Sequence, residues 1–296
     1  MDSEKKLKTE SGLSLYHPWV SFIYFAAVIA GTLLFIHPVF VGVSLLCAIF
    51  SSVMINGRKT ILATLGFGIP MFIFIALANP LFNHRGATIL FYLFENPVTL
   101  EAIVYGIVSA GMMFAAVIWF TCYNTVVTSD KFIYIFGRIL PSVALIVSMT
   151  LSLIPRLMEQ VKVIADSQRS IGLDWKSGSV KQRIRAGARV LSILVSWALE
   201  DAVITADSMK ARGYGSGKRT SFAKKKMRPG EILTLCALLL LGTVAVFMGD
   251  FWAEYDSAIS VAPLGRGFVA YCILGAFPAL LHVKEGILWR RLRSKI

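Results

Sequence analysis

Apolar residues fall into six long runs, with short polar segments between most of them and one long mixed segment between the fourth and the fifth. A helix needs about 20 mainly apolar residues to cross a bilayer, and each run reaches or approaches that length. The interiors of the runs contain no Asp, Glu, Lys or Arg. The runs cover residues 19–36, 38–55, 61–79, 100–122, 231–248 and 266–283. This pattern predicts about six transmembrane helices, the first of them retained and not cleaved as a signal peptide.

Composition supports the same class. The 296 residues are 56% hydrophobic and only 16% charged, whereas soluble domains carry about a quarter charged residues. A disordered chain and an ordinary soluble enzyme are therefore excluded. We expect an all-α, polytopic membrane protein.

The positive charges fix the expected orientation. The formal net charge is +13, and the chain has 30 Lys and Arg residues. If the N-terminus lies inside, 28 of the 30 fall in inside segments, and only Arg85 and Arg266 lie outside. Because Lys and Arg accumulate on the cytoplasmic side of membrane proteins, both termini are predicted to be cytoplasmic. The expected location is a bacterial or archaeal cell membrane.

The mixed segment contains two further apolar stretches, 139–154 and 190–206. If both crossed the membrane, the eight basic residues between them would lie outside, against the charge rule. We therefore expect two long amphipathic helices on the cytoplasmic side, over about 139–172 and 181–213. The predicted division is a four-span membrane domain over 1–122, a cytoplasmic coupling domain over 123–230, and a membrane hairpin with a basic tail over 231–296.

The first of these helices has a polar face and an apolar face that both follow helical spacing. The polar face consists of Arg156, Glu159, Lys162, Asp166 and Arg169, and the apolar face of Leu153, Leu157, Val161 and Ile164. Such a polar face is either solvated or binds a partner, and charge periodicity alone does not separate the two.

The ends of the two helices repeat each other. Residues 165–172 read Ala-Asp-Ser-Gln-Arg-Ser-Ile-Gly, and residues 206–213 read Ala-Asp-Ser-Met-Lys-Ala-Arg-Gly, at an offset of 41 residues. Each copy ends in a glycine, which favours the left-handed cap of a helix, and places a cation near the negative end of the helix dipole. The repeat predicts either two well-capped helices or two matched helix tips that bind a partner.

Other chemistry is weakly indicated. The four cysteines and four histidines are scattered singly, so we expect no disulfide, metal site or cofactor. Residues 215–220 resemble a phosphate-binding loop, but Arg212 and Arg219 stand where a Walker A motif needs Gly and Ser or Thr. The basic residues of 218–228 precede a span, so they are expected to contact anionic membrane lipids and not nucleic acid.

These features resemble the transmembrane T component of energy-coupling factor (ECF) transporters, the CbiQ-like family. The resemblance rests mainly on Ala211-Arg212-Gly213 and its weaker copy Ser170-Ile171-Gly172. Three other segments fit the same family: 79–86, 137–141 and 154–156.

The resemblance implies a non-enzymatic scaffold of a vitamin or micronutrient importer. Such a scaffold joins a small substrate-binding S component in the membrane to two cytoplasmic ABC-type ATPase subunits. Arg212, between Ala211 and Gly213, would be the ATPase-docking arginine. The first motif departs from the family because Ile171 replaces the arginine, and Arg169 lies two residues away, roughly 200° around a helix.

A scaffold that holds a moving membrane partner needs an apolar surface with small or adaptable residues. The sequence offers Ala110, Gly111, Met112 and Met113 in the fourth run, and Met149, Leu151 and Leu153 on the first coupling helix. Ordinary helix packing is an equally good interpretation of these residues.

Two other classes stay open at this point. A stand-alone secondary transporter or channel usually needs ionisable residues inside the membrane, and the six runs lack them. A membrane-embedded enzyme needs a cluster of His, Asp or Glu; the histidines are single, with His84 beside Arg85 the one worth following. Co-purification of two ATPase subunits would separate the scaffold from both.

Overall fold

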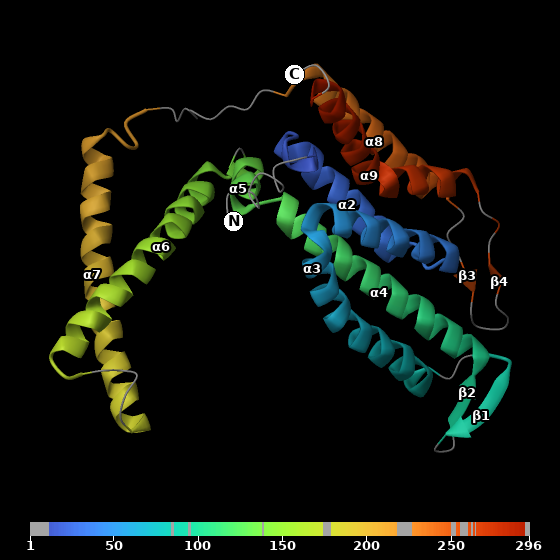
Figure 1. Ribbon diagram of the computed structural model, residues 1–296, viewed down its shortest axis with the longest axis horizontal. Coiled ribbons are helices and arrows are strands. Elements are labelled where there is room, and N and C mark those ends of the chain that lie inside the picture. The colour runs from blue at the N-terminus through green and yellow to red at the C-terminus, as the bar shows by residue number, and fades with distance from the viewer. Residues whose placement is uncertain are drawn as a thin grey trace. The chain divides into compact units, whose positions relative to one another are not determined.

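The computed structural model describes residues 12–83, 86–93, 96–137, 139–173, 179–217, 227–249, 253–254, 260–261, 263 and 265–293. Within these residues the protein is all-α apart from two small hairpins, which confirms the all-α part of the predicted fold class (Figure 1). It divides into two compact units, one of residues 1–132 with 226–296 and one of residues 133–225. The three segments predicted from charge describe topology, which a division by contacts does not test.

The first unit is a helical bundle with a short antiparallel hairpin before α4 and another before α9. Its elements are η1 (Gly12–Ser14), α2 (Pro18–Leu34), α3 (Pro38–Phe82), β1 (Ile89–Leu93), β2 (Asn96–Thr99), α4 (Leu100–Val126), α8 (Pro229–Phe247), β3 (Ala253–Glu254), β4 (Ser260–Val261) and α9 (Arg266–Arg293). Helix α3 packs along α4, and α8 packs along α9 (Figure 1). The short α5 (Ser129–Gly137) leads into the second unit, which contains α6 (Pro141–Ser170) and α7 (Val180–Ala211).

Local sequence explains where several helices begin. Proline occupies the first turn of α2, α3, α6 and α8, where its missing N–H costs nothing. His17 and His37 each precede such a proline, and the ring Nδ1 of each accepts a hydrogen bond from the backbone N–H two residues on, at 3.3 and 3.2 Å. These two histidines are helix caps, a role that the sequence analysis did not assign.

Helix α3 corresponds to two of the predicted runs. Its 45 residues would extend about 67 Å at 1.5 Å per residue, more than twice the roughly 30 Å hydrocarbon thickness of a bilayer. The helical geometry breaks at Gly57, with φ 77° and ψ 169°, a conformation that glycine adopts without a steric penalty. The break lies between runs 38–55 and 61–79, which suits a turn between two crossings.

Among the described helices, α3, α4, α6 and α8 are long and apolar enough to cross a membrane. The apolar parts of α2 and α9 are shorter, at 10–17 residues. These findings support a multi-pass membrane protein. The count of six spans, and the placement of α6 on the cytoplasmic side, remain predictions from the charge distribution.

A buried hydrogen-bond network ties four helices of the first unit together. Thr32 Oγ1 of α2 lies 2.7 Å from Ser44 Oγ of α3 and 2.9 Å from Tyr271 OH of α9. Trp119 of α4 donates from Nε1 to Ser44 Oγ at 3.2 Å. Buried polar groups are costly unless they are paired, so these pairings favour one arrangement of the four helices.

Candidate functional site: two matched helix tips

The candidate site lies in the second unit, where α6 and α7 cross (Figure 1). Among the described residues, α6 and α7 each have one fully buried residue, Ile164 and Val190. Arg156 Nη1 of α6 lies 3.9 Å from Asp201 Oδ2 of α7. The two helices cross while running in opposite directions, so their C-terminal tips lie at opposite ends of the pair (Figure 1).

The faces of α6 follow the sequence pattern. Leu153, Leu157 and Val161 are half-buried and Ile164 is buried, whereas the five residues of the predicted polar face are exposed. The predicted amphipathic division of α6 is therefore confirmed.

The tip of α6 is closed by a Schellman motif. The Gly172 N–H donates to the Arg169 carbonyl at 3.0 Å, and the Leu173 N–H donates to the Gln168 carbonyl at 3.0 Å. Gly172 has φ 81°, the left-handed conformation that this cap requires. These bonds satisfy carbonyls that the helix end would otherwise leave open.

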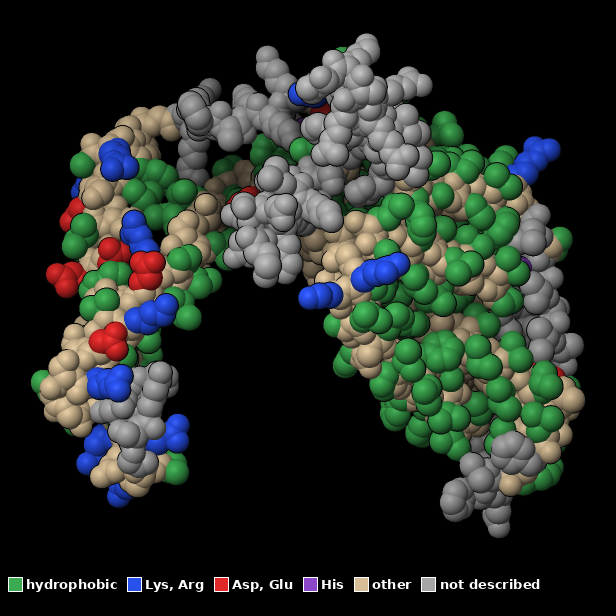
Figure 2. Space-filling view, in the orientation of Figure 1, with side chains coloured by type: hydrophobic (Ala, Val, Ile, Leu, Met, Phe, Trp, Pro, Cys, Tyr) green, Lys and Arg blue, Asp and Glu red, His purple; other side chains and the backbone are tan. Residues whose placement is uncertain are grey.

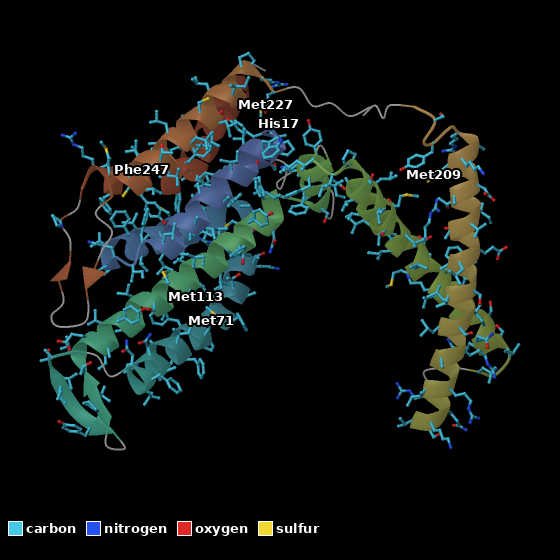
Figure 3. All side chains as sticks on the ribbon, turned by 180° about the vertical axis from the view of Figure 1, so that it is seen from behind. His17, Met71, Met113, Met209, Met227 and Phe247 are labelled. Carbon is cyan, nitrogen blue, oxygen red and sulfur yellow. The ribbon has the colours of Figure 1, made fainter. Side chains whose placement is uncertain are left out.

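The tip of α7 repeats the motif bond for bond. The Gly213 N–H donates to the Lys210 carbonyl at 3.0 Å, the Tyr214 N–H donates to the Met209 carbonyl at 3.0 Å, and Gly213 has φ 77°. Met209, labelled in Figure 3, marks this last turn. The sequence repeat thus corresponds to two nearly identical caps, each at the free end of a long helix.

The shared geometry defines which residues are equivalent. Ile171 and Arg212 both occupy the C-cap, with φ/ψ of −98°/16° and −79°/6°. Arg169 is equivalent to Lys210, one position before Ser170 and Ala211. Ile171, and not Arg169, is therefore the positional equivalent of Arg212.

Both tips are exposed. Ile171 is 65% exposed, and Arg169, Ser170, Gly172, Ala211, Arg212 and Gly213 are also exposed. A Cβ atom on Gly172 would contact nothing within 4 Å, so the glycine is required by its backbone angle and not by crowding. Chemically, one tip presents an apolar side chain and the other a guanidinium with five donors.

We expect Gly213→Ala to weaken the cap of α7 and Gly187→Ala to strengthen the same helix. Alanine at the left-handed position costs about 1 kcal/mol. Gly187 lies in the helix interior with open space around it, where alanine adds about 1 kcal/mol of helix propensity. Hydrogen exchange of the Tyr214 amide, which bonds across the cap, should speed up several-fold in the first variant only. Faster exchange in both, or in neither, would contradict the assigned cap.

The residues predicted to contact an S component divide by exposure. Ala110 and Gly111 are buried in the first unit, and a Cβ on Gly111 would lie 3.1 Å from Val41 Cγ1 of α3. Gly111 thus lets α4 approach α3, and both residues are buried within the first unit. Met112 is half-buried, whereas Met113 is 42% exposed on α4 (Figure 3).

The members on α6 are more accessible. Met149 and Leu151 are 37% and 38% exposed, and Leu153 is half-buried. They lie on the N-terminal half of α6, far along the helix from its tip.

Two further points concern alternative chemistry. His84 and Arg85 lie outside the described residues, as does Arg138 of the segment 137–141. In the described part of the chain, no three His, Cys, Asp or Glu side chains lie together as metal ligands do.

Glu101, a buried acid at the start of α4, has a structural role. Its carboxylate accepts hydrogen bonds from the Thr88 N–H, at 3.2 and 3.3 Å, and from the Thr88 hydroxyl. These bonds hold the start of the β1–β2 hairpin against α4. A carboxylate engaged in this way is poorly suited to carry protons through the membrane.

Comparison with known proteins places these features in a transport family. The CbiQ family profile, described as cobalt transport protein, matches residues 14–222, which include both helix tips. The energy-coupling factor transporter transmembrane protein EcfT of Macrococcus caseolyticus is 28% identical over 207 residues, covering 66% of this chain and 75% of that protein.

Two other relatives carry the same description. The protein of Listeria innocua is 31% identical over 184 residues, covering 57% of this chain and 68% of the relative. The protein of Bacillus subtilis is 34% identical over 106 residues, where the match covers only 36% of this chain and 40% of that relative.

Proposed function

The chain belongs to the CbiQ family, and on that premise we propose that it is the transmembrane T component of an ECF importer. In this role it couples ATP hydrolysis by two cytoplasmic ABC-type ATPase subunits to uptake of a vitamin or micronutrient held by a small membrane S component. It performs no chemistry of its own. The named relatives are described as transmembrane proteins of ECF transporters, which supports the role but not the partners.

The observation that carries the proposal is the pair of matched tips. A single Schellman cap is common and needs no functional explanation. Two caps with the same hydrogen bonds, the same positive-φ glycine and the same preceding sequence, at opposite ends of a crossed helix pair, suit a partner with two similar binding sites. Two ATPase subunits related by approximate two-fold symmetry supply such sites.

The tips would bind by different contacts. Arg212 can reach past the helix end and donate to carboxylates or carbonyls of an ATPase groove. Ile171, at the equivalent position, can only add apolar contact. We therefore place most of the polar recognition, and most of the specificity, at the α7 tip formed by Ala211, Arg212 and Gly213. The α6 tip, with Ser170, Ile171, Gly172 and Arg169, is the weaker dock.

The S component would contact exposed apolar residues of the chain. Met113 on α4 and Met149 and Leu151 on α6 are candidates by exposure, whereas Leu153 is half-buried on the apolar face of α6. Methionine adapts well to a partner that changes position. Ala110 and Gly111 are not part of this surface in the structure.

Affinity purification of the chain from native membranes tests the proposal. Two ATPase subunits and one small membrane protein should co-purify, and ATP turnover should appear only in fractions that contain the ATPases. ATP turnover by the single purified chain, or uptake by the single chain in vesicles, would instead support an enzyme or a stand-alone transporter.

We expect residue 216, just beyond the α7 tip, to be cytoplasmic. Ser216 is exposed, and a cysteine placed there in a background without the four native cysteines should resist a membrane-impermeant maleimide in intact cells. A cysteine at Leu90, which is 52% exposed on the hairpin predicted to lie outside, should react. Labelling of position 216 before the cells are permeabilised would overturn the predicted topology.

A further inference from the structure

The first part of α7, residues 180–199, carries an apolar stripe that does not face α6. Its members recur at steps of four and seven residues, which places them within a sector of about 100° on the helix. They are Val180, Ile184, Leu191, Val195 and Leu199, with exposed fractions of 71, 68, 60, 50 and 65%. The face toward α6 is a different one, marked by the buried Val190 and by Asp201, which pairs with Arg156 of α6.

Basic side chains border this stripe. Lys181, Arg185 and Arg189 recur every four residues on one side, and Arg183 lies on the other; all four are exposed. Residues 180–199 contain no Asp or Glu. Figure 2 shows Lys and Arg side chains gathered around the end of the second unit where α7 begins.

This arrangement of charge is unfavourable for the helix alone. Like charges four residues apart repel each other, and cations near a helix N-terminus oppose the helix dipole. Both penalties fall when an anionic surface lies beside the helix. An exposed apolar stripe between basic residues is typical of helices that lie in a membrane interface.

We propose that this part of α7 binds the anionic surface of the lipid bilayer. The aliphatic stripe enters the boundary between headgroups and acyl chains, while the Lys and Arg side chains extend to lipid phosphates. Protein-binding hot spots are rich in Trp and Tyr, and the stripe contains neither. Trp197, the one aromatic residue of 180–199, is half-buried and is not a member of the stripe.

The binding does not depend on the proposed ATPase contacts, so it can be tested on the full chain alone. An environment-sensitive fluorophore is attached at Leu191→Cys on the stripe or, as a control, at Ser196→Cys on another exposed face, each in a background without the native cysteines. The chain is reconstituted in vesicles of phosphatidylcholine alone or of equal parts phosphatidylcholine and phosphatidylglycerol. Each set of vesicles also carries a lipid with a nitroxide quencher.

We expect strong quenching at position 191 in the anionic vesicles and little at position 196. Each basic residue near an anionic surface strengthens binding about five-fold, so Lys181→Gln with Arg185→Gln and Arg189→Gln should reduce the quenched fraction severely, as should high salt. Equal quenching at 191 and 196, or quenching that ignores lipid charge, overturns the proposal. A change in fluorophore emission at position 191 that appears only when ATPase subunits are added, without quenching by the lipid, would assign the stripe to a protein partner instead.

Discussion

The Arg212→Glu variant should lose its ATPase subunits and its uptake activity while still folding and inserting in the membrane. Arg212 is exposed at the C-cap of α7, and the hydrogen bonds of the cap use its backbone, not its side chain. Truncation of an interface arginine often costs about 2 kcal/mol or more, which is roughly a 30-fold loss of affinity. Glutamate should be worse than alanine, because it also opposes the helix dipole.

Two other substitutions of basic residues, one at each tip, provide controls for this effect. Lys210→Ala removes a cation from the same last turn, and Arg169→Ala removes the equivalent cation from α6; both should reduce co-purification less than Arg212→Ala. The measurement is pull-down of ATPase subunits, together with substrate uptake, at matched membrane abundance. If Arg212 only caps the helix, its loss costs a few tenths of a kcal/mol and Arg212→Glu retains wild-type co-purification, which would refute the docking role.

The Gly68→Ala variant should destabilise the first unit, whereas Gly66→Ala should not. A Cβ on Gly68 would overlap Cε2 of Phe114, a buried ring that packs edge-on against Phe72 at 6.4 Å between centroids. A Cβ on Gly66, two residues earlier on the same helix, would contact nothing within 4 Å. Overpacking of this kind costs about 1–3 kcal/mol.

The difference in stability is measured by thermal unfolding in detergent. Unfolding is monitored as the loss of the monodisperse peak in size-exclusion chromatography. Gly68→Ala should unfold at a clearly lower temperature than the parent, and Gly66→Ala at the same or a slightly higher temperature, because alanine favours the helix. Equal midpoints for the two variants would mean that α3 and α4 do not approach each other as closely as the structure has them.

Much of the fold follows from patterns that are local in the sequence. Long apolar runs predict helices because the backbone must satisfy its own hydrogen bonds in lipid, and α4 and α8 follow such runs closely. The amphipathic faces of α6 and the glycine caps at 172 and 213 were also predictable, since helical spacing and positive φ leave a direct signature in the residues.

Other features depend on contacts between distant residues. Nothing local indicates that Thr32, Ser44, Trp119 and Tyr271 meet, because four separate helices supply them. Ala110 and Gly111 show the same limit: small residues predict a close helix approach, but not that the neighbour is α3 of the same chain. The caps at His17 and His37 had a usable signal, since each histidine stands directly before a proline that begins a helix.

The sequence repeat indicated that the two helix ends are related, but not the details of their cap geometry. The sequence identified 170–172 and 211–213 as related tips, and the cap geometry shows which of their residues are equivalent. The matched hydrogen bonds answer this point, because they align Arg169 with Lys210 and Ile171 with Arg212.

Photo-crosslinking from the two tips is the most direct test that they bind ATPases. A photoreactive amino acid would replace Ile171 or Tyr214, which are 65% and 45% exposed. The full chain would be co-expressed with the ATPase subunits and the S component of its native host. Val203, 61% exposed on the shaft of α7, provides the control. The account predicts adducts to ATPase subunits from both tips and none from position 203; adducts only within the chain or to lipid, from both tips, would contradict it.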